Sequence, residues 1–224
     1  FDTAGAAAYA LAIAALTHGL SALPAGRASL SLALSAAALV LFVRRQLTAA
    51  SPLIDLRLLR DNRVFAFSNL AALINYASTF AVGFLMSLDL QYVRGLSPRQ
   101  AGLVMMSQPV MQALCSPLAG RLSDRVEPRL LASAGMAFTA SGLAWLSMAG
   151  ASTGLAHIGA ALFVLGVGFG LFSSPNTNAV MGAVEPRHYG LASAMVGTMR
   201  MLGQMLSMAA ATLVIAVAVG RTAI

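Results

Sequence analysis

The stretch from residue 156 to residue 182 reads AHIGAALFVLGVGFGLFSSPNTNAVMG and contains no aspartate, glutamate, lysine or arginine. An α-helix needs about 20 consecutive apolar residues to cross a hydrocarbon core about 30 Å thick. Similar apolar runs recur along the whole chain, which is 58% hydrophobic and only 9% charged. Soluble domains carry about 25% charged residues. The sequence therefore predicts an all-α, polytopic transmembrane helical bundle and excludes an ordinary soluble fold.

Proline and glycine residues divide the chain into about seven predicted membrane helices. We place these helices at residues 4–23, 28–43, 64–90, 99–120, 130–149, 156–182 and 190–219. They form three predicted parts: a helical pair in 1–47, an arginine-rich cytoplasmic loop in 48–63, and a five-helix block in 64–224. Because the chain opens with Phe1 and Asp2 and stops soon after Arg221, we interpret it as a fragment of a longer protein.

The arginines are divided unevenly between the two sides of the predicted bundle. With the N-terminus in the cytoplasm, nine fall on the cytoplasmic side: Arg44, Arg45, Arg57, Arg60, Arg63, Arg121, Arg125, Arg129 and Arg187. The other side has Arg27, Arg94, Arg99 and Arg221. This imbalance follows the positive-inside rule and predicts the orientation. Since the arginines lie in short loops and not on a continuous basic face, the net charge of +7 indicates topology and not nucleic-acid binding.

The sharpest local signal is the loop GRLSDRVEPR at residues 120–129, between two predicted helices on the cytoplasmic side. Gly120 allows close approach of two backbones, and Arg121, Arg125 and Arg129 hold the loop at the lipid headgroups. Asp124 can cap or neutralise a positive helix N-terminus. A bland basic turn would explain the arginines but not the whole string.

This string resembles the G-x-L-x-D-R-x-G-x-R signature of the major facilitator superfamily, with Glu127 where the signature usually has glycine. The resemblance implies that it is a cytoplasmic gating loop. Three further segments resemble the fourteen-helix drug:proton antiporter subfamily: SPLIDLRLLR at 51–60, LQYVRGLSPRQAG at 90–102, and GLAS through TMRMLG at 190–203. The resemblance implies that the first two helices are the linker pair of that subfamily. The remaining five would then be the second half of the transporter without its last helix.

The resemblance implies a secondary active transporter of the cell membrane that exchanges protons for drugs or other amphipathic or cationic compounds by alternating access. Its partners would be the lipid bilayer, the small-molecule substrate, protons, and the N-terminal half of the same transporter; no cofactor is expected. Two alternatives stay open: a facilitator carrier for a specific metabolite, siderophore or lipid, and a non-transporting membrane scaffold. No enzyme or metal site is expected, because the sequence has no HExxH motif, no Ser/His/Asp arrangement, no phosphate loop and a single cysteine, Cys115.

Two charged residues inside predicted helices are candidates for the transport pathway. Arg200 lies about 15 Å along its helix from Gly190, and its position resembles that of an arginine in the same helix of the subfamily. A charge at this depth requires a wet cavity or a partner, so Arg200 either serves in gating or clamps a carbonyl or an acid of the absent half. Asp89 stands where the subfamily usually has an aromatic residue. It is either a protonatable group facing the cavity or an interfacial carboxylate.

Uncharged polar residues inside the apolar runs complete the predicted pathway: Asn75, Gln108, Gln112 and Asn178, with Asn69, Tyr76, Asn176 and Gln204 beside them. Each needs a hydrogen-bond partner or water. Singly they act as glue between helices, whereas as a set facing one cavity they line a transport path. Gly166 and Gly170 predict a seam of close helix packing. The methionines at 195, 199, 201, 205 and 208 offer either a plastic surface for varied apolar compounds or ordinary packing.

Overall fold

The computed structural model describes residues 2–22, 27–48 and 60–220. Within these residues the chain forms helices and short turns, and none of them is in a β-strand. The elements are α1 (Thr3–Ser21), α2 (Arg27–Thr48), α4 (Arg63–Leu88), the π-helical turn η1 (Asp89–Val93), α5 (Pro98–Met105), α6 (Ser107–Ser123), α7 (Pro128–Ser147), α8 (Leu155–Gly182), the 3₁₀ turn η2 (Pro186–His188) and α9 (Tyr189–Gly220). The prediction of an all-α bundle is confirmed.

The predicted helix at 99–120 is two helices in the structure, α5 and α6, separated at Met106. Pro109 is the third residue of α6 and has no backbone N–H, so the hydrogen bond from residue 109 to the carbonyl of Met105 cannot form. The start of α5 is well defined by Ser97 and Gln100, whose side chains form a reciprocal capping box ahead of the helix. The apolar run was read correctly, and the break follows from Pro109.

Five helical stretches are long and apolar enough to cross a membrane: Ala28–Thr48, Arg63–Val93, Pro128–Ser147, Leu155–Gly182 and Pro186–Ala216. The break at Met106 leaves α6 with 17 residues. For α1 and for the α5–α6 pair, a membrane crossing therefore stays a prediction. The predicted cytoplasmic loop falls mostly on residues 49–59, which lie outside the described residues, and the division into three parts also stays a prediction.

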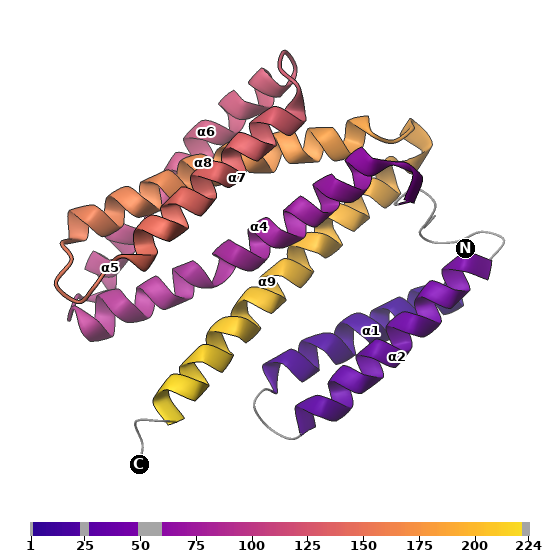
Figure 1. Cartoon of the computed structure of the whole chain (residues 1–224), viewed down its shortest axis with the longest axis horizontal. Helices are drawn as coiled ribbons and strands as arrows, with labels where there is room; N and C mark the ends of the chain where they lie inside the picture. Colours follow the sequence, from indigo (N-terminus) through magenta and orange to yellow (C-terminus); the bar gives the residue numbers. More distant parts are fainter. Residues whose placement is uncertain (1, 23–26, 49–59, 221–224) are drawn as a thin grey trace.

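The helices associate in two tightly packed groups and a hairpin (Figure 1). One group is α8 with α6 and α7, and the other is the pair α4 and α9, which run side by side. The helices α1 and α2 form the hairpin, and α1 contacts α9. Contacts between α4 and α8 join the two groups and are lighter than those within each group. This boundary is where polar and charged residues of different helices can meet.

Glycines of α8 allow its neighbours to approach on two sides. A Cβ built on Gly166 would lie 2.3 Å from the carbonyl oxygen of Gln108 in α6, and one on Gly170 would lie 2.7 Å from Cys115 Cβ. On the other side, a Cβ on Gly168 would lie 2.5 Å from the backbone nitrogen of Thr139 in α7. The predicted seam at Gly166 and Gly170 is confirmed, and Gly168 extends it to a second helix.

Many large apolar side chains point outward. Leu30 is 76% exposed, Phe67 66% and Val214 67%. A soluble protein of this size rarely leaves so much contiguous apolar surface in contact with water, whereas a lipid environment favours it. The surface of the bundle is thus suited to the hydrocarbon interior of a membrane.

Candidate functional site

Asn75 is one of the two most buried residues of the predicted pathway. It lies in α4 with only 2% of its surface exposed, and its amide nitrogen has no hydrogen-bond partner among the described residues. Asn69, two turns earlier on the same helix, donates to the carbonyl of Phe65 at 2.9 Å but leaves its own amide oxygen without a partner in the same part of the chain. Each unsatisfied atom costs about 1–3 kcal/mol. Water or a polar group beyond these residues is needed to satisfy them.

Gln108, Gln112 and Asn178 lie along the contact between α6 and α8. The backbone oxygens of both glutamines face the glycines of α8, while their side chains are partly exposed. Asn178 donates from its side-chain amide to Ser123 Oγ at 2.6 Å, which ties the end of α8 to the end of α6. For Asn178 the structure shows an interhelical hydrogen bond, and a part in the pathway stays a prediction for all three residues.

Arg200 lies eleven residues into α9, about 16 Å from the start of this helix. Its side chain is exposed, and no described residue forms an ion pair or hydrogen bond with it. An arginine at the centre of a lipid-facing helix costs about 2.5–3.5 kcal/mol on insertion scales. Arg200 is therefore placed to interact with water, with a ligand or with a group outside the described residues.

Asp89 is tied down at the far end of α4. Its carboxylate accepts a hydrogen bond from Arg94 Nε at 2.7 Å, and the same guanidinium donates to the carbonyls of Thr153 and, at 2.9 Å, of Gly150. These contacts clamp η1 to the turn between α7 and α8. The geometry matches the interfacial interpretation of Asp89, and its role as a protonatable pathway group stays a prediction.

The predicted gating loop begins inside α6 and ends in α7. Gly120 faces Ser174 Oγ of α8, where an added Cβ would lie at 2.9 Å. Arg121, Asp124 and Arg125 line a shallow pocket, and Asp124 stands at the C-terminal end of α6. Among the described residues Asp124 does not cap a helix N-terminus, since the residue before α7 is Glu127. Close approach at Gly120 is thus present, whereas the gating role of the loop stays a prediction.

Arg129, the last residue of the predicted loop, forms an ion pair with Glu127 at the start of α7.

The predicted residues fall at separate places in the bundle. Gly120 and Asn178 both lie where the C-terminal ends of α6 and α8 meet, whereas Asn75 and Arg200 belong to the α4–α9 pair and Asp89 to the C-terminal end of α4. A single closed site is therefore not formed by the described residues alone.

Comparison with known proteins decides the family. Residues 69–224 match the Major Facilitator Superfamily. The chain belongs to this superfamily. It is 34% identical over 91% of its length to an uncharacterized transporter, YebQ, of Escherichia coli, of which it covers 45%. It is 31% identical over 73% of its length to the riboflavin transporter RibZ of Clostridioides difficile, covering 36% of that protein. It is 32% identical over 76% of its length to the methyl viologen resistance protein SmvA of Salmonella typhimurium, covering 34%.

This major facilitator chain thus spans between a third and a half of the length of the curated relatives it matches. Its family identifies it as part of a multi-pass membrane transporter and not an enzyme. The bilayer follows as a partner from membership of the family, and a small-molecule substrate of the whole protein stays a prediction.

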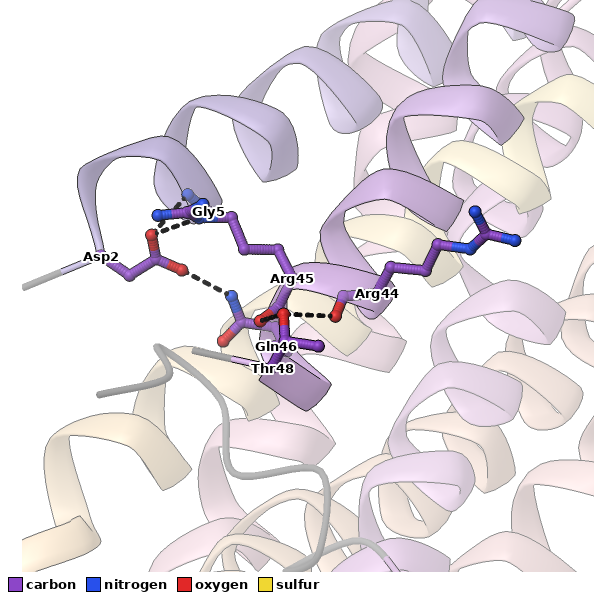
Figure 2. A network of polar contacts seen from close by, with 6 residues as sticks. All are labelled: Asp2, Gly5, Arg44, Arg45, Gln46 and Thr48. Carbon is purple, nitrogen blue, oxygen red and sulfur yellow. Dashed lines mark hydrogen bonds and ion pairs between the residues drawn. The ribbon is translucent and has the colours of Figure 1, made fainter. Parts of the chain in front are cut away.

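Sequence reasoning missed a polar cluster that closes the α1–α2 hairpin of this transporter chain (Figure 2). Asp2 caps α1 by accepting from the backbone nitrogen of Gly5 at 3.0 Å, and it also accepts from Arg45 Nε at 2.7 Å and Gln46 Nε2 at 3.1 Å. The backbone N–H of Gly5 and then the guanidinium of Arg45 hold the pKa of Asp2 below its usual value. An aspartate directly before an apolar run is the signal that identifies such a cap.

The hairpin also contacts the half-bundle of this facilitator chain through α1. Tyr9 donates to Thr198 Oγ1 of α9 at 2.6 Å. Further along the same contact, Thr17, Phe80 and Gln204 line a pocket of about 440 Å³ together with Met201, Met205 and Met208. Three of the methionines singled out from the sequence therefore gather at one pocket between α1, α4 and α9.

Proposed function

We propose that this chain is the C-terminal part of a proton-coupled exporter of cationic and amphipathic compounds in the cell membrane. The exporter would work by alternating access, with its N-terminal half supplied by sequence outside this chain. The relatives that extend to about two or three times the length of this chain support the existence of that other half. Transport would then require both halves, because the pathway lies between them.

The observation that carries this proposal is the exposed guanidinium of Arg200 in the middle of α9. A membrane scaffold has no use for a charge that must be kept in contact with water or a partner at this depth. In a transporter, by contrast, Arg200 can pair with an acid of the other half in one conformation and lose that partner in the next. An acid that gains and loses a neighbouring cation changes its pKa, and this change couples proton release to the conformational cycle.

The methionine-lined pocket supports the substrate class. Its volume of about 440 Å³ lies within the range of about 300–1,000 Å³ that small-molecule sites occupy. Flexible, polarisable methionine side chains adapt to ligands of different shape. Gln204 and Thr17 add polar groups to these apolar walls. The likeness to a methyl viologen resistance protein, named after an organic dication, points in the same direction.

A second candidate is a carrier for one defined metabolite. The riboflavin transporter among the relatives favours it, at 31% identity over 73% of this chain. Such a carrier needs polar groups placed for one ligand, and Asn69 and Asn75 each have one buried amide atom without a partner among the described residues. The exporter should move unrelated cations, whereas the carrier for one metabolite should not, so cation export separates the two candidates.

The test uses the complete gene in cells that lack their own efflux pumps. Efflux of a fluorescent cationic dye is followed with and without a protonophore, in the wild type and in Arg200→Gln. Arg187→Gln is the matched control, because Arg187 lies just before α9 in an exposed turn, where it pairs with Glu185. The proposal expects protonophore-sensitive efflux that Arg200→Gln reduces about 10-fold or more, while Arg187→Gln stays within about two-fold of wild type.

Absence of dye efflux from protein shown to reach the membrane would refute cation export. Equal efflux with and without protonophore would refute proton coupling. In parallel, radiolabelled riboflavin is followed in the same cells. Riboflavin movement without dye movement would establish the defined-metabolite carrier in place of the exporter.

A further inference from the structure

The two tightly packed groups of helices are each held together by backbone contact. In the group of α6, α7 and α8, glycines of α8 bring the backbones of its two neighbours close. In the pair of α4 and α9, a Cβ on Gly203 would lie 2.6 Å from the carbonyl oxygen of Leu73. Ser207 Oγ of α9 also accepts a hydrogen bond from the backbone nitrogen of Ala81 at 3.0 Å. Helices in such contact move as one unit, because backbone atoms have no second rotamer to adopt.

The interface between α4 and α8, which joins the two groups, is made by side chains instead. The rings of Tyr76 and Phe169 meet edge to face with their centroids 5.2 Å apart, and Ala72 packs in one cluster with Phe172. The glycine of α4, Gly83, has nothing within 4 Å of its Cβ position, and no glycine of α8 faces α4. Interfaces of packed side chains allow small sliding movements that close backbone contact resists.

Two buried amides of α4 leave this interface imperfect. Asn69 lies three residues before Ala72 and Asn75 three residues after it, about one helical turn on either side. The side-chain oxygen of Asn69 and the side-chain nitrogen of Asn75 are inaccessible and have no partner among the described residues. While the present packing holds, neither water nor a group of another segment can reach them. Opening of the interface would give both atoms partners, so they favour the open arrangement over the closed one.

The C-terminal end of α4 is held firmly to the other group. Through Arg94, the carboxylate of Asp89 is linked to two carbonyls of the turn between α7 and α8, and the Arg94 side chain is only 10% exposed. Beside this clamp, Leu90 is fully buried in one cluster with Ala101 of α5 and Ile158 of α8. Hydrogen bonds made by a charged group are stronger than those between neutral groups.

The N-terminal end of α4 is held more weakly. Here the side-chain amide of Asn62 donates one neutral hydrogen bond to the carbonyl of Ala183 at the end of α8. We infer that this half-bundle consists of two rigid units, α6–α7–α8 and α4–α9, which open along the α4–α8 interface about the Arg94 clamp. The opening exposes Asn69 and Asn75 and leaves the clamped end closed. This movement occurs within one half, in addition to any movement between two halves, and it does not depend on the compound transported.

The test measures how fast buried cysteines react with N-ethylmaleimide in the full-length protein, from which all other cysteines have been removed. Ala72→Cys reports on the interface and Ala101→Cys on the clamped end; both alanines are 1% exposed, so they form a matched pair. Thr139→Cys, at a position 3% exposed where α7 meets α8, reports on the rigid group. Each rate is divided by the rate for the same variant in denaturing detergent. We expect Ala72→Cys to react about 10-fold faster or more than the other two, because local opening exposes it alone.

Two substitutions test the clamp and the amide separately. Arg94→Gln should raise the rate of Ala101→Cys about 10-fold and leave Thr139→Cys unchanged, which also shows that the fold is kept. The milder Asp89→Asn should raise the Ala101→Cys rate by less. Asn75→Leu replaces the unpartnered amide by an apolar side chain of similar size, so it should stabilise the closed interface and slow Ala72→Cys about 5-fold.

Three results would overturn the inference. Equal rates for Ala72→Cys, Ala101→Cys and Thr139→Cys would show uniform fluctuation and not two rigid units. A faster reaction at Ala101→Cys than at Ala72→Cys would exclude the Arg94 clamp as the pivot. An unchanged Ala72→Cys rate in Asn75→Leu would remove the amide as a cause of opening. Because transport is not measured in this experiment, its outcome is independent of whether the protein exports cations.

Discussion

The packing of α8 against α6 makes a sharp prediction for Gly166→Ala. The added methyl carbon would lie 2.3 Å from the carbonyl oxygen of Gln108 and 2.9 Å from Met111 Cβ. Ordinary contacts between such atoms are about 3.4–4.0 Å, so α6 must move away from α8 by about 1 Å. The atom in the way belongs to a helix backbone and cannot rotate aside.

Overpacking of this kind costs about 1–3 kcal/mol. The alanine also gains about 1 kcal/mol of helix propensity in water, a gain that would partly mask the loss. A matched control separates the two effects. Gly159 lies in the same helix, and a Cβ there meets nothing within 4 Å. Gly159→Ala therefore measures the effect of helix propensity without the effect of overpacking against α6.

The assay is unfolding of the full-length protein in mixed micelles by titration with a denaturing detergent, followed by circular dichroism. We expect Gly166→Ala to be about 1–2 kcal/mol less stable than wild type and Gly159→Ala to be equal or slightly more stable. If Gly166→Ala matched Gly159→Ala, the close approach of α6 and α8 would be wrong. If both lost stability equally, the loss would come from the glycines themselves and not from the contact.

Three further outcomes are expected. Arg94→Ala should lower the free energy of unfolding by about 2–4 kcal/mol, because it removes charge-assisted hydrogen bonds made by a side chain that is only 10% exposed. Asp89→Asn should lower it by less. The 148–154 turn should be cleaved by protease fastest in Arg94→Ala, more slowly in Asp89→Asn and slowest in the wild type. Tyr9→Phe should weaken contact with Thr198 by about 1 kcal/mol, measured by cysteine cross-linking between α1 and α9. The pKa of Asp2 is lowered in the folded state, so its stabilisation of the hairpin is present above the ordinary carboxyl pKa and is lost as pH falls through the lowered value. Cross-linking of α1 to α2 should therefore be unchanged from pH 8 to pH 5. Asp2→Asn should weaken this cross-linking at neutral pH.

The helices could be predicted because membrane thickness sets their length. Each predicted range falls on a helix whose ends agree within a few residues, apart from 99–120, which is divided into two helices at Met106, and 28–43, whose helix continues to Thr48. Apolarity alone did not predict that α2 extends through Arg44 and Arg45, because charged residues after an apolar run usually indicate a loop. The structure keeps them helical because Arg45 and Gln46 contact Asp2 at the start of α1. That pairing joins residues more than forty positions apart.

The individual side-chain partners of the candidate site were less predictable. A sequence places Asp89 near a helix end, but it does not show that Arg94 folds back to it or that the turn at Gly150 supplies a carbonyl. Local hydrophobicity likewise does not bring Arg63 and Arg129 to one cleft, because that depends on how α4 and α7 pack. Contacts between residues far apart in the sequence depend on how the helices pack, and patterns in a single sequence predict this packing least well.

A cleft lined by Arg63 of α4 and Arg129 of α7 lies at the boundary between the two tightly packed groups. Glycine contacts fix α6, α7 and α8 against one another, so any bending within this half is easiest between α8 and the α4–α9 pair. A ligand shifts such an equilibrium only by its difference in affinity for the two arrangements. An anion held by one arginine from each side would therefore favour the arrangement in which the two arginines are close.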